Sequence, residues 1–215
     1  MDEKNKCLFL HNFTVVKFIG IILSLSFPLF ILGQAANSIV MEEAEKHSGG
    51  GYTWSSTGVY KNLMVGDEVF LEKSISGTYC SGFTFSVAFE TVKRLSVLPD
   101  TIGPKLKRFQ RVWYGIPPES IERQCVLALE EMQWGCAKDL PEAIPGDFVQ
   151  FWRNNNSGHA VIFMNWVKNE KEQIVGINYR SSQKQTNGIG SRTETIGSGP
   201  KDININRIYI GRIEL

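Results

Sequence analysis

The sequence lacks several features that would assign it quickly to a class of protein. It has no charge bias, because 23 lysines and arginines face 22 aspartates and glutamates in 215 residues. A domain that binds nucleic acid carries a basic patch or stripe, so this balance argues against a nucleic-acid partner. Four cysteines are too few for a disulfide scaffold. The histidines and carboxylates are too scattered to supply the closely spaced ligands of a metal, and we expect neither a metal nor a cofactor.

Long apolar runs are also absent, except near the N-terminus. Residues 18–33 (FIGIILSLSFPLFILG) carry no charge, but they are fewer than the roughly 20 residues that a spanning helix needs. Three lysines precede this run, and Gly33-Gln34-Ala35 follows it with small residues at the two positions that a signal peptidase reads. We therefore expect residues 1–35 to be a signal peptide, with a retained membrane anchor or a core helix as the alternatives. The first two predict an exported protein: periplasmic, secreted or anchored on the outer side of a membrane.

Without this leader the chain has 180 residues, which we expect to form one domain over residues 36–215. This domain keeps three of the four cysteines, Cys80, Cys125 and Cys136. An odd number of cysteines in an exported protein indicates a reactive thiol or an intermolecular bridge. Cys125 and Cys136 could form a disulfide in an oxidising compartment, and the alternative is a pair of buried thiols.

The spacing of apolar residues predicts helices first and strands second. The expected helices are residues 38–47, 80–92 and 117–132. The expected strands are residues 147–152, 159–166, 174–179 and 203–213. Residues 186–199 are rich in glycine and threonine, and we expect a long loop there. Helices followed by an antiparallel meander predict an α+β domain.

Cys80 has the clearest chemical signature. It stands in Cys-Ser-Gly-Phe at the start of the second predicted helix. A thiol there lies near the positive end of the helix dipole, which favours the nucleophilic thiolate. Gly82 allows another backbone to approach closely. The alternative is a buried structural cysteine.

His159 begins a predicted strand, after the turn residue Gly158 and with Val161 and Phe163 on the same face. At the edge of an apolar sheet its imidazole could accept the thiol proton as general base and return it to a leaving amine. The alternative is a surface histidine or a hydrogen-bonded core histidine. His47 ends a polar helix beside three glycines, and we expect it to be a helix C-terminal residue.

Three motifs occur in a fixed order along the chain. They are Cys-Ser-Gly-Phe from Cys80, Pro-Gly-Asp-Phe-Val-Gln-Phe-Trp from Pro145 and Gly-His-Ala-Val-Ile-Phe from Gly158. In this order, over roughly residues 75–183, the chain resembles the NlpC-like papain-fold cell-wall peptidases and the related CHAP amidohydrolases. The resemblance implies a papain-like fold with N-terminal helices packed on an antiparallel β-sheet. One departure is Tyr79, because NlpC-like members usually carry Asp before the cysteine.

The resemblance also implies roles for individual residues. Cys80 would be the nucleophile, His159 the base, and a polar residue on the next strand would orient the imidazole. Counting through the predicted turn places Asn178 at this third position. Ser182 lies on the same face of the strand, and Gln183 is the other choice, because a register slip of one residue exchanges the faces.

The oxyanion of a tetrahedral intermediate needs the backbone N–H of Cys80 and a second donor. NlpC-like enzymes often use an upstream tyrosine, and Tyr52, Tyr60 and Tyr79 are the choices here. The predicted binding residues are Tyr79, Ser81, Ser182 and Gln183. Asp147 of Pro-Gly-Asp is expected to brace its turn rather than act as a catalytic acid. The five tryptophans are expected to be core and rim residues rather than a ligand-binding platform.

The sequence therefore predicts an exported cysteine peptidase or amidase that hydrolyses amide bonds. The resemblance implies peptidoglycan peptides as its substrate. Two alternatives remain. One is a papain-fold binding module at the cell envelope that has lost turnover, and the other is an acyltransferase that uses the same Cys80–His159 dyad.

Overall fold

The structure is a computed structural model that describes the backbone of residues 28–215 and the side chains from residue 36 onward. Most of the predicted leader, including the start of its apolar run, lies outside the described residues. Within the described residues, no helix is long and apolar enough to cross a membrane. Signal peptide, anchor and export therefore stay predictions.

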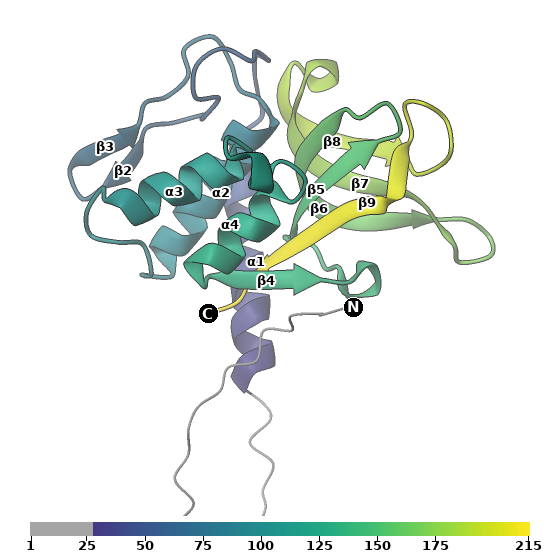
Figure 1. The fold of residues 1–215 in the computed structure, drawn as a ribbon, viewed down its shortest axis with the longest axis horizontal. Helices are drawn as coiled ribbons and strands as arrows, with labels where there is room; N and C mark the ends of the chain where they lie inside the picture. Colours follow the sequence, from purple (N-terminus) through teal and green to yellow (C-terminus); the bar gives the residue numbers. More distant parts are fainter. Residues whose placement is uncertain (1–27) are drawn as a thin grey trace, which may run out of the picture.

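The fold is α+β, with N-terminal helices and a seven-stranded antiparallel sheet, as the order of the sequence patterns predicts. The α-helices are α1 (Pro28–Glu45), α2 (Cys80–Arg94), α3 (Pro104–Trp113) and α4 (Gln124–Met132). The short 3-10 helices are η1 (Pro118–Ser120), η2 (Leu140–Glu142) and η3 (Lys184–Thr186). Figure 1 shows α2, α3 and α4 gathered on one side of the molecule, with β2 and β3 beside them, and β5 to β9 on the other side.

Three of the helices differ from the predicted ones. Helix α1 begins at Pro28 rather than at residue 38, so that its start lies within the predicted leader, and it ends at Glu45 rather than at residue 47. Helix α3 was not predicted, although it begins at Pro104 and proline is favoured in the first turn of a helix, where its missing N–H is not needed. Helix α4 is shorter than predicted, since residues 118–120 form η1 instead. It ends where Gln133 adopts a left-handed conformation, with φ of 58°.

The strands of the large sheet have the order β1-β8-β7-β6-β5-β9-β4, and each neighbouring pair is antiparallel. They are β1 (Gly49–Gly50), β4 (Gly135–Lys138), β5 (Phe148–Arg153), β6 (Gly158–Lys168), β7 (Ile174–Gln183), β8 (Gly188–Thr195) and β9 (Ile203–Ile213). A separate hairpin joins β2 (Leu63–Val65) to β3 (Glu68–Leu71). Strands β5, β6, β7 and β9 correspond to the four predicted strands, with β5 beginning one residue later than predicted, whereas β1, β2, β3 and β4 were not predicted.

The expectation of a long loop over residues 186–199 is wrong, because most of that segment is β8. Eight consecutive residue pairs join β8 to β7, from Gly176↔Thr195 to Gln183↔Gly188. Glycine and threonine do not forbid a strand when a neighbouring strand supplies the ladder hydrogen bonds. Composition alone therefore misassigned this segment.

The sheet separates two apolar clusters. Phe148 and Ile162 face α2, α3 and α4 and join the larger cluster, which holds most of the buried aromatic residues. The opposite face of β5, β6, β7 and β9 carries a second cluster that includes Phe151 and Tyr179. Strands β8, β7, β6, β5 and β9 are consecutive in the sheet. A β-bridge between Ile196, just after β8, and Ile203, at the start of β9, joins the first of these five strands to the last. The sheet therefore closes at that end around the second cluster.

The Pro-Gly-Asp turn ties α1 to the sheet through Asp147, which is fully buried. The Asp147 carboxylate accepts hydrogen bonds from the Ile144 backbone N–H, from Nδ2 of Asn37 on α1, and from the guanidinium of Arg212. The expectation that Asp147 braces its turn is confirmed.

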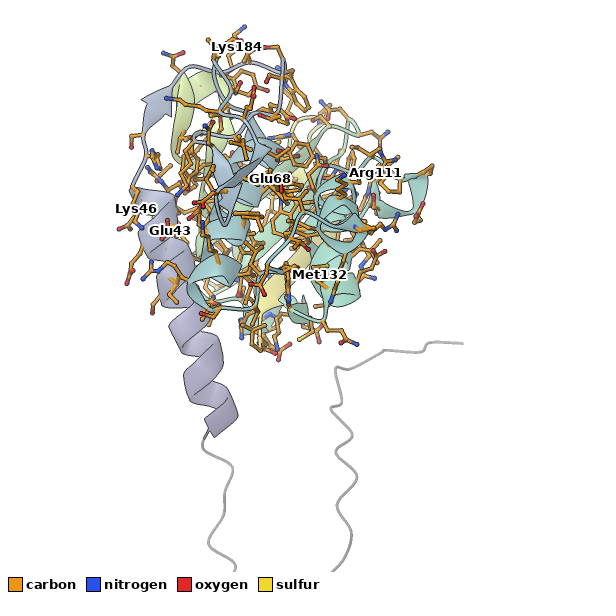
Figure 2. All side chains as sticks on the ribbon, turned by 90° about the vertical axis from the view of Figure 1, so that its left-hand side faces the viewer. Glu43, Lys46, Glu68, Arg111, Met132 and Lys184 are labelled. Atoms are coloured by element: carbon orange, nitrogen blue, oxygen red, sulfur yellow. The ribbon has the colours of Figure 1, made fainter. Side chains whose placement is uncertain are left out.

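Figure 2 shows Lys184, directly after β7, at the end of the molecule opposite the start of α1.

Candidate active site

Cys80 is the first residue of α2, and its side chain is only 5% exposed. Tyr79 precedes it in an extended conformation, and the first backbone N–H groups of a helix have no carbonyl partner within the helix. Close packing fixes this position. A Cβ on Gly82 would lie 2.3 Å from the carbonyl carbon of Gly58, and a Cβ on Gly58 would lie 2.3 Å from the Tyr79 ring. Two glycines are therefore required where the loop at residue 58 passes the start of α2.

The chain just before Cys80 is held from two sides. The backbone of Thr78 exchanges hydrogen bonds with Gly51 and Thr53, at 3.0 and 3.1 Å, so that Tyr52 lies beside Thr78 in a short parallel bridge. The Thr78 hydroxyl lies 2.7 Å from the hydroxyl of Ser182 on β7. The start of α2 is thus joined both to the loop that carries Tyr52 and to the sheet.

His159 lies near the start of β6 and is 8% exposed. Its ring packs edge-on against the rings of Phe151 on β5 and Tyr179 on β7, with centroids 5.7 and 5.6 Å away. Its Nε2 lies 3.4 Å from Oε1 of Gln183, at the end of β7. Two aromatic rings and an amide therefore limit the orientations that the imidazole can adopt.

The pKa of the Cys80 thiol is lowered by its contact with the His159 imidazole. Burial raises this pKa, but the positive charge of His159, a hydrogen bond with its imidazole and a hydrogen bond from the backbone N–H of Ala160 lower it to about 7. A further contribution comes from Ser81, whose Oγ lies 3.9 Å from the Cys80 sulfur. Burial alone would leave Cys80 as an inert thiol. The His159 imidazole and the Ala160 N–H instead favour the thiolate, which is the nucleophilic form, near neutral pH.

Gln183 is oriented by its own hydrogen bonds. Its amide nitrogen donates to Oγ1 of Thr186 at 2.7 Å and to the carbonyl oxygen of Gly190 at 3.3 Å. Both contacts use the nitrogen, so the amide oxygen is directed to His159 and can accept only from a protonated Nε2. This arrangement leaves Nδ1 as the basic nitrogen of the neutral imidazole.

The structure does not bring Asn178 to His159, and this corrects the predicted third residue. Asn178 pairs with Asn165 across the β6–β7 ladder, and its Nδ2 donates to Oδ1 of Asn165. A bulge between Phe163 and Asn165 changes the register, and β7 continues to Gln183. The pleat then directs Tyr179 and Gln183 to the face that holds His159. Asn178 is one of the alternate residues of β7, whose side chains lie on the other face of the sheet from His159.

The other predicted binding residues have different surroundings. Ser81 is buried beside the thiol, whereas Ser182 is fully buried and its hydroxyl is engaged with Thr78. The Tyr79 side chain stacks on Trp54, with ring centroids 5.3 Å apart and planes at 9°, and packs edge-on against Tyr114. Of the four, Gln183 and Ser81 contact the dyad, while Ser182 and Tyr79 fix the elements that carry it.

The three tyrosines considered for the oxyanion are distinguished by their neighbours. Tyr60 is buried against His47 and Phe83. The Tyr79 hydroxyl donates to the Ser56 carbonyl oxygen at 3.4 Å. Tyr52 is half-buried; burial raises its pKa, a hydrogen bond from Trp54 lowers it, and the nearby charge of Cys80 raises it. Tyr52 is therefore the tyrosine whose hydroxyl is available near the thiol.

A buried charged cluster that the sequence did not indicate lies behind His159. Arg153, at the end of β5, donates two hydrogen bonds to Glu194 of β8, at 2.8 and 2.7 Å. Tyr179 donates to the same carboxylate at 2.6 Å. Burial raises the pKa of Glu194, but these hydrogen bonds outweigh it and the net shift is downward. Sequence offered no signal for this pair, because its members are 41 residues apart.

The remaining two cysteines are not paired with each other. Cys125 and Cys136 are both buried thiols that form no disulfide with each other, so the structure contains the second of the two predicted alternatives. Burial raises the pKa of Cys125 to about 12, which makes it a poor nucleophile. Cys136 donates a hydrogen bond to the Glu214 carboxylate at 3.1 Å.

Within the described residues, no group of three or more histidine, cysteine, aspartate or glutamate side chains could hold a metal ion. Comparisons of the chain with family models, with curated proteins and with solved structures find no match in any of the three. The geometry of the site and the order of the sequence motifs are therefore the features that indicate a function.

Proposed function

We propose that this protein is a papain-fold cysteine hydrolase that cleaves amide bonds. The observation that carries the proposal is the lowered pKa of Cys80, about 7, at a helix N-terminus against an imidazole that Gln183 orients. A thiolate, a general base and a group that holds the base in one tautomer are the parts that acyl transfer needs.

The reaction follows from these positions. The Cys80 thiolate attacks the carbonyl carbon of the amide, and the resulting oxyanion accepts hydrogen bonds from the Cys80 backbone N–H and the Tyr52 hydroxyl. The protonated His159 then gives its proton to the leaving amine, which departs and leaves a thioester on Cys80. His159 next takes a proton from water, whose oxygen attacks the thioester; the carbon–sulfur bond breaks, and the acid leaves the Cys80 thiolate and the protonated His159 with which the reaction began.

Peptidoglycan peptides are the proposed substrate class, at a location outside the cytoplasm. This part of the proposal is supported by the ordered Cys-Ser-Gly, Pro-Gly-Asp and Gly-His-Ala motifs and by the signal-like residues 1–35. The motifs lie at a helix start, at a turn leading into β5 and at the start of β6, and this arrangement supports the papain-like fold that we propose.

Hydrolysis of purified cell wall and of a synthetic stem-peptide amide tests the proposal. We expect wild-type protein to release the amine, and Cys80→Ala to abolish the release. Gln183→Ala should lower kcat, whereas Asn178→Ala, a matched removal of an amide from the same strand, should leave kcat unchanged. Undiminished hydrolysis by Cys80→Ala would refute the mechanism.

The same assay separates the alternatives. A Cys80 that reacts with a thiol reagent no faster than in denatured protein, together with no hydrolysis, is the result expected for a binding module. Transfer of the acyl group to an added amine in preference to water is the result expected for an acyltransferase.

A further inference from the structure

Trp54 is the second most exposed large hydrophobic residue of the described chain, at 67%, yet it contacts two neighbouring tyrosines. Its indole lies flat on the ring of Tyr79, the residue before Cys80. Its Nε1 donates a hydrogen bond to the hydroxyl oxygen of Tyr52. The stack fixes the plane of the indole, and the plane fixes the direction of the N–H.

The direction of this hydrogen bond determines what the Tyr52 hydroxyl can do. An indole N–H is only a donor, so the phenolic oxygen is the acceptor and keeps its own proton for another partner. Among the described residues, that proton has no acceptor in the protein. The bridge between Tyr52 and Thr78 places the Tyr52 backbone beside the chain that leads into α2, and the charge of Cys80 is near enough to the Tyr52 hydroxyl to raise its pKa. The free O–H is thus available to an oxygen that develops charge at Cys80.

Accepting one hydrogen bond also makes the hydroxyl a better donor, because hydrogen bonds in a chain polarise one another. The Trp54 contact acts on Tyr52 in that direction, lowering its pKa against the effect of burial. The benefit is greatest where negative charge appears on the acceptor, that is, in the tetrahedral intermediate rather than in the bound substrate.

We propose that Trp54 is a positioning residue of the oxyanion site, which through its Nε1–H orients and polarises the Tyr52 hydroxyl towards the substrate oxygen. This inference rests on the proposed function and adds a residue that does not itself touch the reacting atoms.

A reversible aldehyde tests the inference without requiring turnover. The Cys80 sulfur adds to the carbonyl carbon of acetyl-alanyl aldehyde, the C=O double bond becomes a single bond, and the thiol proton ends on the new oxygen. That oxygen of the hemithioacetal occupies the oxyanion position. The dissociation constant of the hemithioacetal is measured by NMR with the aldehyde carbon labelled with ¹³C. This constant reports how strongly the site stabilises the hemithioacetal oxygen.

Trp54→Phe keeps an aromatic ring on Tyr79 and removes only the N–H. We expect it to weaken aldehyde binding and to lower kcat for the stem-peptide amide by about 2- to 13-fold, the range for the loss of one hydrogen bond, with KM unchanged. Tyr52→Phe should lower both by a larger factor. In the Tyr52→Phe background, Trp54→Phe should have no further effect, because the hydroxyl through which it acts is gone.

Two controls exclude a general structural effect. Tyr114→Phe removes a hydrogen bond from the same aromatic cluster, since the Tyr114 hydroxyl donates to the Thr57 carbonyl oxygen at 2.7 Å, and it should leave aldehyde binding unchanged. Alkylation of Cys80 by iodoacetamide forms no oxyanion, so its rate and pH profile should be the same in Trp54→Phe as in wild-type protein.

The outcomes separate this inference from the function it rests on. Wild-type protein that forms no hemithioacetal at Cys80 overturns both. Normal adduct formation with an unchanged dissociation constant in Trp54→Phe overturns the positioning role alone. So does a Trp54→Phe effect that persists in full without the Tyr52 hydroxyl, or one that is accompanied by a shifted alkylation profile.

Discussion

Replacement of His159 by alanine is expected to move the ionisation of Cys80 from about pH 7 to pH 9 or above. The structure lowers the pKa of this thiol from 9.0 to about 7 although burial acts in the opposite direction. This difference corresponds to about 3 kcal/mol in favour of the thiolate. The His159 charge and the His159 hydrogen bond are the two largest of the effects that lower this pKa and offset the burial. Without the imidazole, burial is opposed only by the Ala160 N–H and the Ser81 hydroxyl.

The rate of alkylation follows from this shift. At pH 7 the thiolate fraction falls from about one half to about one in a hundred, or about 50-fold. A thiolate of higher pKa is intrinsically more nucleophilic, and a Brønsted slope of 0.4–0.5 over two pKa units returns about 6- to 10-fold. The net loss of the alkylation rate at pH 7 is therefore about 5- to 8-fold, and the midpoint of the pH profile moves by at least two units.

The assay is the pH dependence of iodoacetamide alkylation of Cys80, followed by mass spectrometry of the peptide that contains it. Cys125, a buried thiol outside the site, is the internal reference. The ultraviolet absorbance of the thiolate, taken as a difference from Cys80→Ser, measures the same ionisation without a requirement for reagent access. A His159→Ala protein that retains a midpoint near pH 7 would refute the assignment of His159 as the partner of the thiol.

Three further results are expected from unfolding in urea. Gly82→Ala should lower the free energy of unfolding by about 1–3 kcal/mol, because its Cβ meets backbone 2.3 Å away, whereas Gly103→Ala, with open space around its Cβ, should cost less. Arg153→Met should cost about 3–5 kcal/mol by leaving Glu194 buried without its main partner, and adding Glu194→Gln should recover part of the loss; no recovery would contradict a charge effect. The downward pKa of Glu194 means that its contribution is present at neutral pH, above the pKa of the unfolded carboxyl, and is lost as the pH falls through the folded value. The stability gap between wild-type protein and Glu194→Gln should therefore narrow on acidification below about pH 4, and a gap that is constant with pH would show that the carboxylate charge is not involved.

The elements that carry the dyad were predictable because their signals are local. Cys80 precedes apolar residues at helical spacing, and His159 follows a turn and begins an alternating apolar run. Each pattern is complete within about a dozen residues. The turn-bracing role of Asp147 was also predicted, and its nearest partner, the Ile144 N–H, is three residues away.

The third residue could not be decided in the same way. The choice between Asn178 and Gln183 depends on where β6 and β7 are paired, and a bulge in β6 shifts that pairing by one residue. Because side chains alternate between the faces of a strand, such a shift exchanges the residues that face the imidazole. No property of either residue alone records it.

What the sequence by itself determined is the set of local elements: a thiol at the start of a helix, a histidine at the start of a strand, and the order of helices before strands. The tertiary structure decided which distant groups meet them. It placed Gln183 against His159, Tyr52 beside the start of α2, and the Arg153–Glu194 pair behind the imidazole. The physical reason is that helix and strand periodicity is set by neighbours along the chain, whereas register and buried ion pairs depend on residues that only folding brings together.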